Sequence, residues 1–536
     1  MFRYCVILLI GLLVTSGCMR EQPNIIIITA TFPAEPYVVD IPTNTPQASA
    51  TPFIPVAQNL SPVPDVPLSQ PTPNVTRVPI QVADEHTVQA GDTLSAIANR
   101  YNVPVNTLIE LNQIDNPNVL SVGQVLQLPE APSEYTPDFK IIPDSRLVRG
   151  PDSTSFDIAA FINQQPGYIR TATDTVTTRL ANGAGFDRVL TSSQVVRRVA
   201  LEYSVDPRLL LAMLEYRAGW LSNPQPRDDL QTHPLISAEA SGLADRSGLY
   251  RQLVWLANEL NRGYYGWKYR GNVVIQFSDG SRSLYNPTLN PGTIAVQYAL
   301  SRAGTPYSTW EQQVSITGLY GVYVQYFGDP FADAIDPLVP PTIQQPVLDL
   351  PFEDGVEWRF TGGFHGGWGS GSAWSSVDFA PSEERPQSTF CYVSSAWVTA
   401  VARGVIARVE DGVIVLDLDG DGDEATGWTM NYLHVTVDES IRAGMTVLPG
   451  QRLGNPSCEG GVSNATHLHI GRRFNGEWLP ADCQQCLTNV NIPPFVMEGW
   501  QVIGIAGQEY QGYMQKGSER IQAEQGIATD INRISG

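Results

Sequence analysis

Two of the six histidines in this 536-residue chain stand one residue apart, in the stretch Thr466-His467-Leu468-His469-Ile470. Side chains at positions i and i+2 of a β-strand point to the same face of a sheet. On a strand, His467 and His469 would therefore face a cleft together while their apolar neighbours pack on a core. Neutral imidazole is the commonest metal ligand among side chains and a general acid or base near neutral pH. The stretch thus predicts a β-sheet with a chemically active face; the alternative is two unrelated surface histidines on a strand.

The chain is too long for one ordinary hydrophobic core, and its length predicts roughly three to four domains. Its net charge of −21 argues against a nucleic-acid partner, because a phosphate binder needs a basic face. The same charge does not favour electrostatic adhesion to anionic lipids. We therefore expect a multidomain protein whose partners are recognised by other chemistry.

The first residues are typical of an export signal. Arg3 precedes the apolar run Val6 to Val14, which leads into Thr15-Ser16-Gly17-Cys18. These residues resemble a bacterial lipoprotein signal, which implies removal of residues 1–17 and a lipid on Cys18. A plain secretory signal or an uncleaved anchor is the alternative. We expect an exported protein held to the membrane by lipid, at the cell surface or in the periplasm or cell wall.

Residues 18–84 are rich in Pro and Thr, a composition that favours an extended polyproline II tether. Residues 85–130 predict a compact unit of strand, helix, helix and strand, in which His86 is a strand residue without a metal role. The motif V-x-x-G-D-T-L-x-x-I-A-x-x-Y, followed by L-x-x-L-N and G-Q-x-L-x-L-P, resembles a LysM module. The resemblance implies binding of glycans that contain N-acetylglucosamine. The implied glycan-binding residues are Gly91, Asp92, Thr93, Asn112 and Ile114.

After a predicted linker, 131–146, residues 147–337 show apolar residues at helical spacing and predict a mostly helical domain. The run from Val205 to Trp220 resembles the opening of lysozyme-like lytic transglycosylases, where such a helix ends in a catalytic Glu-Ser pair. Arg217-Ala218 stand in that place here, and Glu215 comes two residues early, about 200° around the helix. We expect a structural adaptor, with a degenerate glycan groove or a working glycosidase as alternatives.

Four of the six cysteines fall in the C-terminal third of the chain, and they predict two disulfides in an exported domain. Three pairings are possible, of which we favour Cys391–Cys458 with Cys483–Cys486. Half of a zinc knuckle or a redox pair at Cys483-Gln-Gln-Cys486 is the alternative interpretation.

A second linker, 338–346, precedes residues 347–500, whose short alternating runs and glycine turns predict an antiparallel all-β domain. Its polar motifs are a glycine-rich loop with His365, an isolated Asp378, the run Tyr432-Leu433-His434, and the paired histidines. Together they resemble the lysostaphin-type zinc endopeptidases of bacterial cell walls. The wide His-to-Asp separation is closest to the β-lytic, or staphylolytic, branch. The resemblance implies one zinc ion held by His365, Asp378 and His469, with His434 and His467 as the catalytic pair.

Two imidazoles and a carboxylate suit a tetrahedral zinc site with one open position. Bound zinc lowers the pKa of a water ligand to about 7 and polarises a carbonyl. His434 and His467 would then orient the water, stabilise the oxyanion and return a proton to the leaving amine.

The run from Asp417 to Asp423 has the D-x-D-x-D-G spacing of a calcium loop, but Trp428 stands where the twelfth-position Glu would be. We expect a polar hairpin tip; the alternative is Ca²⁺ held by Asp417, Asp419, Asp421 and Asp423. The extension 501–536 is expected to pack on the peptidase domain.

The sequence as a whole therefore predicts a zinc endopeptidase that hydrolyses stem or cross-bridge peptides of peptidoglycan, anchored by lipid and by LysM. A non-catalytic peptidoglycan-binding scaffold and a dual-activity hydrolase that also cleaves glycan are the alternatives.

Overall fold

The computed structural model describes most of the residues that follow the predicted tether. The signal peptide, Cys18, the tether and Gly91 lie outside the described residues, as do a few short gaps. Among the described residues, no helix combines the length and the hydrophobicity needed to cross a bilayer. The described residues are 85–89, 92–101, 103, 105–114, 116–117, 119–129, 132–383, 386, 389–483, 486, 491–505, 507–525 and 530–536.

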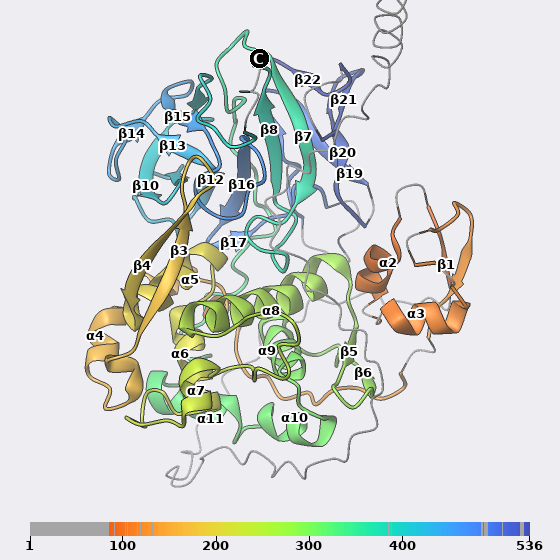
Figure 1. Cartoon of the computed structure of the whole chain (residues 1–536), viewed down its shortest axis with the longest axis vertical. Helices are drawn as coiled ribbons and strands as arrows, with labels where there is room; N and C mark the ends of the chain where they lie inside the picture. Colours follow the sequence, from red (N-terminus) through yellow and green to blue (C-terminus); the bar gives the residue numbers. More distant parts are fainter. Residues whose placement is uncertain are drawn as a thin grey trace, which may run out of the picture.

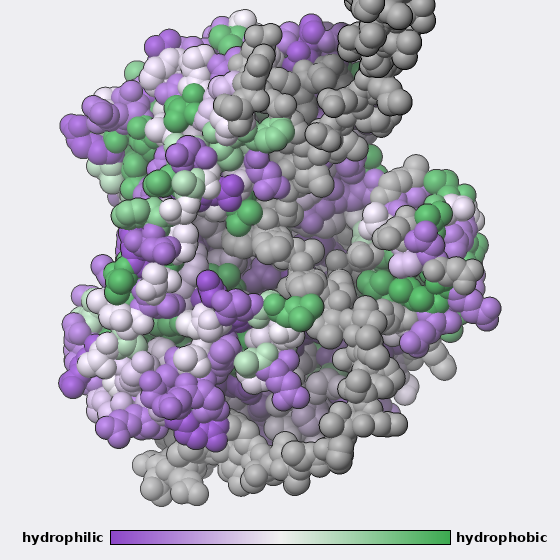
Figure 2. Space-filling model, in the orientation of Figure 1, coloured by the Kyte–Doolittle hydropathy of each residue, from purple (hydrophilic) through white to green (hydrophobic). Residues whose placement is uncertain are grey.

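The N-terminal described unit has the predicted order of strand, helix, helix and strand (orange in Figure 1). Its two strands pair antiparallel, and Ile97, Leu108 and Leu126 are buried together in a core of its own. Figure 2 shows hydrophobic residues on the surface of this unit. Its exposed hydrophobic residues include Leu111 and Val122. The elements are β1 (Glu85–Thr87), α2 (Leu94–Tyr101), α3 (Val105–Asn112) and β2 (Val125–Gln127).

The middle of the sequence is helical, as predicted, but it also carries two small hairpins. A Thr191 capping box starts one helix, which ends at Ser204 in the left-handed conformation. Asp206 then caps the next helix, which begins at Pro207. The elements are α4 (Ile158–Asn163), β3 (Thr173–Arg179), β4 (Gly185–Thr191), α5 (Ser192–Tyr203), α6 (Pro207–Ala218), α7 (Asp228–Thr232), α8 (Leu249–Arg270), β5 (Val274–Gln276), β6 (Arg282–Leu284), α9 (Pro291–Arg302), α10 (Tyr307–Gln313) and α11 (Leu319–Phe327).

Residues expected as linkers pack into the domains beside them. Ile141 and Ile142 are buried, and the hydroxyl of Thr293 accepts hydrogen bonds from both of their backbone amides. Leu338 and Val339 are buried in the same hydrophobic cluster. Their Pro-rich composition resembles a linker, but their apolar side chains pack in the core.

The C-terminal third is antiparallel and all-β, as predicted. A nine-stranded sheet runs in the order β14-β10-β11-β12-β16-β8-β7-β22, with β17 paired to β16. Both favoured disulfides are present, Cys391–Cys458 and Cys483–Cys486. The strands are β7 (Trp358–His365), β8 (Ser376–Pro381), β9 (Val398–Thr399), β10 (Gly404–Glu410), β11 (Val413–Asp417), β12 (Trp428–Leu433), β13 (Val435–Val437), β14 (Thr446–Val447), β15 (Arg452–Pro456), β16 (Leu468–Phe474) and β17 (Glu477–Trp478).

The extension packs on this domain and completes it. Its last strand pairs with β7 at the edge of the main sheet, and another strand lies against β7 so closely that a side chain at Gly363 would meet the Gln511 carbonyl oxygen at 2.3 Å. The strands are β18 (Val496–Met497), β19 (Trp500–Ile505), β20 (Gln508–Lys516), β21 (Glu519–Gln522) and β22 (Arg533–Ile534).

The hydrophobic core of the helical domain extends into the β domain, which also has a core of its own around Phe360 and Phe379. Figure 1 shows α5 and α8 between the rest of the helical domain and the β domain. Leu256 of α8 belongs to the same buried cluster as Trp368 and Trp478 of the β domain. These two regions therefore pack into one body and are not separate domains joined by a flexible linker.

Candidate metal centre

Three neighbouring strands carry the predicted metal ligands. β16 pairs with β8 so that His469 lies opposite Asp378, and β8 pairs with β7, which ends at His365. The pairing of β7 is irregular between Gly362 and His365. A side chain at Gly362 would lie 2.7 Å from Asp378 Oδ2, so glycine leaves room for the carboxylate.

One atom from each of the three predicted ligands lies within about hydrogen-bonding distance of the other two. His365 Nε2 lies 2.9 Å from His469 Nδ1, and Asp378 Oδ1 lies 3.1 Å from each of these nitrogens. His365 and Asp378 are fully buried and His469 is 1% exposed. Ligand atoms at about 2.0–2.1 Å from a tetrahedral zinc ion would be about 3.3 Å apart, which is close to these separations.

The outer nitrogens of both rings fix their tautomers. His365 Nδ1 lies 2.7 Å from the Gly363 carbonyl oxygen, and His469 Nε2 lies 3.2 Å from that of Gly367. Each outer nitrogen must donate to its carbonyl, so the inner nitrogens present lone pairs to one another and to the carboxylate. When both rings are neutral, three electron-rich atoms therefore converge, and Asp378 Oδ2 has no hydrogen-bond partner among the described residues. Against the effect of burial, the Asp378 carboxylate raises the pKa of His365, as a cation held at the same place would stabilise the carboxylate. This donor set fits a divalent cation.

His434 and His467 repeat the arrangement beside the three ligands. The Nδ1 atoms lie 3.0 Å and 2.9 Å from the carbonyl oxygens of Glu459 and Ala465, respectively. Within the part of the protein that the structure describes, neither Nε2 atom has a hydrogen-bond partner, and the two ring centroids are 4.6 Å apart. His434 has a left-handed backbone, with φ of 64°, where β12 ends.

Burial keeps these two rings neutral. It lowers the pKa of His434 well below its ordinary value, and the neighbouring His467 and His469 lower it further. Burial also lowers the pKa of His467, against the opposing pull of Asp378. Each ring thus offers an unprotonated Nε2 that can accept a proton or a hydrogen bond at neutral pH.

Two residues from the extension complete the site and were not predicted. The ring of Tyr510 stacks on His365 with centroids 4.3 Å apart and planes at 25°, and its backbone has φ of 67°. Glu509 Oε1 accepts a hydrogen bond of 3.2 Å from the backbone amide of Gly366. The tail sequence carries no spacing that links it to His365, so only the folded protein reveals the contact.

The site is closed to solvent. The cavity beside it, lined by residues that include Trp368, His434 and Gly461, has a volume of about 10 Å³, which suffices for one water molecule. A neighbouring cavity of about 20 Å³ also touches Trp368 and Gly461, and its other walls include Arg198 and Glu202 of α5. The helical domain therefore covers the cleft.

The other predicted sites have mixed outcomes. The carboxylate of Glu215 accepts hydrogen bonds from Leu221, Ser222 and Tyr326, so it closes a loop of its own domain. Asp417 is buried, and its carboxylate accepts hydrogen bonds from the backbone amides of its own turn. Burial and then Asp419 raise the pKa of Asp417 to about 6. Asp417, Asp419 and Asp421 lie within reach of a common cation, and calcium there stays a prediction.

The predicted glycan-binding side chains mostly hold their own unit together. Asp92 Oδ2 lies 2.8 Å from His86 Nε2, and Asn112 hydrogen bonds to the backbone of Gln127 through both its oxygen and its nitrogen. The hydroxyl of Thr93 accepts from the amide of Ala96 at the start of α2, and Ile114 packs partly buried on the core.

Comparison with known proteins identifies two segments. A family model described as "LasA, N-terminal domain" matches residues 140–341, and one described as "LysM domain" matches residues 86–129. The first match covers the helical domain; the likeness of that domain to lysozyme-like folds stays a prediction.

Individual proteins align with longer or shorter parts of the chain. "Protease LasA" of Pseudomonas aeruginosa is 23% identical over 355 residues, 63% of this chain and 74% of that protein. "N-acetylmuramoyl-L-alanine amidase XlyB" of Bacillus subtilis is 45% identical over 51 residues, 10% of this chain and 16% of that protein. A solved structure titled "A Novel M23 Metalloprotease Pseudoalterin from Deep-sea" is 25% identical, with a TM-score of 0.26, over 34% of this chain and 96% of that one.

The family models and the alignment with Protease LasA support the resemblance stated from the motifs, a LysM-containing peptidase of the lysostaphin type.

Proposed function

We propose that the protein is a zinc endopeptidase that hydrolyses peptide bonds in peptidoglycan. The observation that carries this proposal is the convergence of one ligand atom each from His365, Asp378 and His469, with the outer nitrogen of each ring held by a backbone carbonyl oxygen. A bound zinc ion would supply an activated water and polarise the scissile carbonyl.

His434 and His467 are the groups that would handle protons. Each is neutral, buried and fixed in one tautomer by a backbone carbonyl, so each Nε2 is ready to accept a proton or to hold a water in place. Once protonated, either ring could donate to the leaving amine. Which ring acts as base stays open in the proposal.

The N-terminal parts would bring the peptidase to its polymer. The LysM unit would bind N-acetylglucosamine-containing glycan, and a lipid on Cys18 with the extended tether would hold the protein near the membrane. Glu215 is engaged in closing a loop, so we do not propose glycan cleavage by the helical domain.

Metal analysis of the full-length protein tests the centre directly. We expect one zinc per molecule in the wild type and a loss of zinc in His469→Ala. His233→Ala is the matched control, because the His233 ring lies in the helical domain beside the Thr232 hydroxyl, and this variant should keep the metal. Equal zinc content in all three proteins would contradict the site.

Digestion of purified peptidoglycan tests the reaction. We expect newly released amino groups with the wild type and far fewer with His434→Ala. Release that is equal in the two proteins would end the enzyme proposal and leave a wall-binding scaffold.

A further inference from the structure

Among the described residues, the candidate metal centre has no opening wide enough for a substrate. All five of its polar residues are at most 1% exposed, and the adjoining cavity of about 10 Å³ is far smaller than a peptide. A polymer substrate can reach His434 only if something moves, and the second cavity shows that α5 forms the cover.

The tip of the β3–β4 hairpin lies on a short stretch of peptide edge in the β domain. The backbone amide of Cys458 donates to the Ala181 carbonyl oxygen at 3.1 Å, and that of Gly460 donates to the Arg179 carbonyl oxygen at 3.0 Å. Alternate residues are used, and the two segments run in opposite directions. Both bonds are donated by the edge, so the contact makes one half of the reciprocal bonding by which an extended peptide adds as an antiparallel strand.

This edge is continuous with the candidate catalytic pair. Between the two donors, the Glu459 carbonyl oxygen is the acceptor that fixes the His434 tautomer. Gly461, which follows the second donor, lines both cavities, and a side chain there would approach His434 Cε1 to 3.4 Å. A peptide strand on this edge would therefore pass directly beside His434.

Small residues at the hairpin tip suit close contact with the edge. At Gly183, an added side chain would lie 2.9 Å from Cys391 Sγ, in the disulfide that anchors Cys458. The surface therefore leaves no room for a side chain at the position of Gly183, which a glycine in a bound peptide would suit.

Ion pairs fasten the hairpin and α5 to the rim of the same edge. The carboxylate of Asp411, at the β10–β11 turn, forms two ion pairs. Its Oδ1 lies 2.5 Å from Nη2 of Arg188 in the hairpin, and its Oδ2 lies 3.3 Å from Nη1 of Arg198 in α5. The Asp411 carbonyl oxygen lies so near Gly460 that a side chain there would approach it to 2.1 Å. Asp411 and the Cys458–Gly461 edge thus lie side by side and form one wall of the cleft.

We propose that the Cys458–Gly461 edge is where the extended wall peptide docks, and that the β3–β4 hairpin occupies it as a substrate mimic. The inference rests on the proposed function. The protein as folded is then a closed form, which opens when the hairpin withdraws from the edge.

Loosening one ion pair should open the cleft without touching the catalytic residues. In Arg188→Glu, like charges face each other at Asp411. Arg227→Glu is the matched control, since Arg227 pairs with Asp229 on the surface of the same domain. Hydrogen exchange of residues 457–463 should rise in Arg188→Glu and stay at the wild-type level in the control. Unchanged exchange in both would overturn the inference.

Binding separates a substrate mimic from a simple cover. A fluorescent oligoglycine peptide would be titrated against these proteins in a His467→Ala background, which prevents turnover. We expect roughly three- to tenfold tighter apparent binding to Arg188→Glu than to the control, the size of a lost ion pair plus mild repulsion. A synthetic peptide with the sequence of residues 177–184 should compete with it.

Each outcome has a distinct meaning. Failure of the 177–184 peptide to compete, or equal binding by both variants, overturns the mimic. Tighter binding and competition, with no release of amino groups from peptidoglycan by the Arg188→Glu protein that retains His467, supports the docking edge and contradicts the endopeptidase instead.

Discussion

Backbone carbonyl oxygens hold the outer ring nitrogens of the histidines in the candidate metal centre, and His365 has an additional support. Its ring lies between the converging ligands on one side and the Tyr510 ring on the other. A non-glycine residue with positive φ is uncommon, and such strain tends to collect at functional sites. Tyr510 adopts this unfavourable conformation at the one place where its ring can fix His365.

Removing the Tyr510 ring should loosen the metal. We expect Tyr510→Ala to weaken zinc retention by about 10- to 100-fold, as supporting residues of metal ligands typically do. Tyr510→Phe should retain zinc within about threefold, because the stacked ring remains. Zinc release to a competing chelator measures both, and Tyr513→Ala in the same strand is the control. If Tyr510→Phe releases zinc as readily as Tyr510→Ala, the hydroxyl group stabilises the site and the stacked ring does not.

At this scale, the motifs located the five polar residues but not their supports. His467 and His469 lie on one face, as the i, i+2 rule predicts, and strand pairing brings Asp378 to His469. Tyr510 and Glu509 reach the site only because β20 packs on β7, and no local pattern encodes that contact.

A second residue, Asp336, should make stability depend on pH. Burial and then the neighbouring Asp144 raise its pKa to about 7 from 3.8. A raised carboxyl pKa means that the folded state binds the proton more tightly, so this contribution is present below about pH 4 and is lost as pH rises to about 7. The difference corresponds to at most about 4 kcal/mol.

The variant Asp336→Asn should remove that dependence. Its urea midpoint should exceed that of the wild type at about pH 8 and approach it at about pH 5. Asp245→Asn is a suitable control, since that carboxyl is exposed and its pKa is lowered by hydrogen bonds from Ser247. A midpoint difference for Asp336→Asn that does not vary with pH would contradict the assignment.

Among the elements, α8 is the one that joins the two domains. Asn258 Oδ1 accepts from the amide of Gly371 at 2.8 Å, and Arg270 donates to the Ser372 carbonyl oxygen at 3.0 Å. The glycine-rich loop after His365 is therefore held by a helix from the preceding domain. Composition could not predict this, because the loop and the helix lie far apart in the sequence.

The C-terminal turn of α8 also makes a buried ion pair with β17. Lys268 Nζ lies 2.7 Å from Glu477 Oε1, and the hydroxyl of Tyr269 donates to the same oxygen at 2.5 Å. Glu477 is fully buried. Removing one partner of such a pair leaves an uncompensated charge, which costs about 3–5 kcal/mol.

We therefore expect Glu477→Ala to lower the free energy of unfolding by about 3–5 kcal/mol. The double variant Lys268→Met/Glu477→Leu should lose much less, because no charge is left buried. Urea denaturation of the full-length protein gives both values, and Asp229→Ala, in the exposed pair with Arg227, should change stability by less than about 1 kcal/mol. Equal losses in the single and double variants would show that packing, not charge, dominates.

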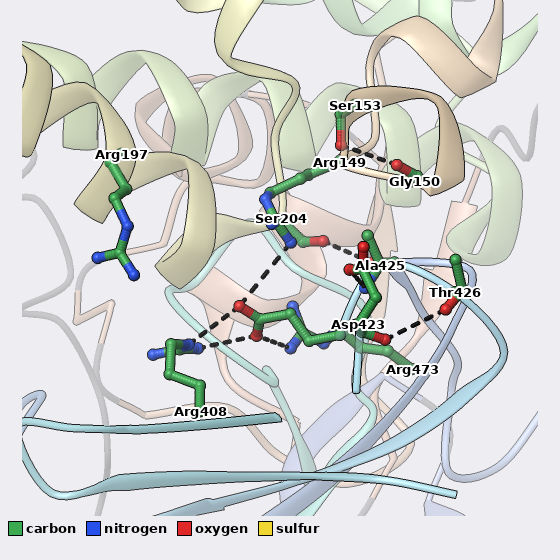
Figure 3. A network of polar contacts seen from close by, with 12 residues as sticks. Arg149, Gly150, Ser153, Arg197, Ser204, Arg408, Asp423, Ala425, Thr426 and Arg473 are labelled. Carbon is green, nitrogen blue, oxygen red and sulfur yellow. Dashed lines mark hydrogen bonds and ion pairs between the residues drawn. The ribbon is translucent and has the colours of Figure 1, made fainter. Parts of the chain in front are cut away.

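Across the whole molecule, the interface between the helical and β domains has the character of a protein interior. Figure 3 shows Arg149, Arg408 and Arg473 converging from separate elements. Their guanidinium groups surround the Glu424 carboxylate, at 3.8, 3.0 and 2.9 Å. Despite burial, these arginines lower the pKa of Glu424 well below its ordinary value. The sequence predicted two domains and a linker, but could not predict that the core of the helical domain extends into the β domain or that this network joins them.

The helical and β domains should therefore unfold together. Breaking them apart would expose shared apolar residues such as Leu256 and Trp478, and would leave charges such as that of Glu424 without partners. The LysM unit has its own core and should melt separately. Calorimetry of the disulfide-intact protein should show one large transition for residues 132–536 and a smaller one for the LysM unit. Glu477→Ala should shift the large transition as a single peak and leave the small one in place. Splitting of the large transition into a helical and a β component would instead mean that the interface is weaker than either core, and that the cover over His434 separates without unfolding either domain.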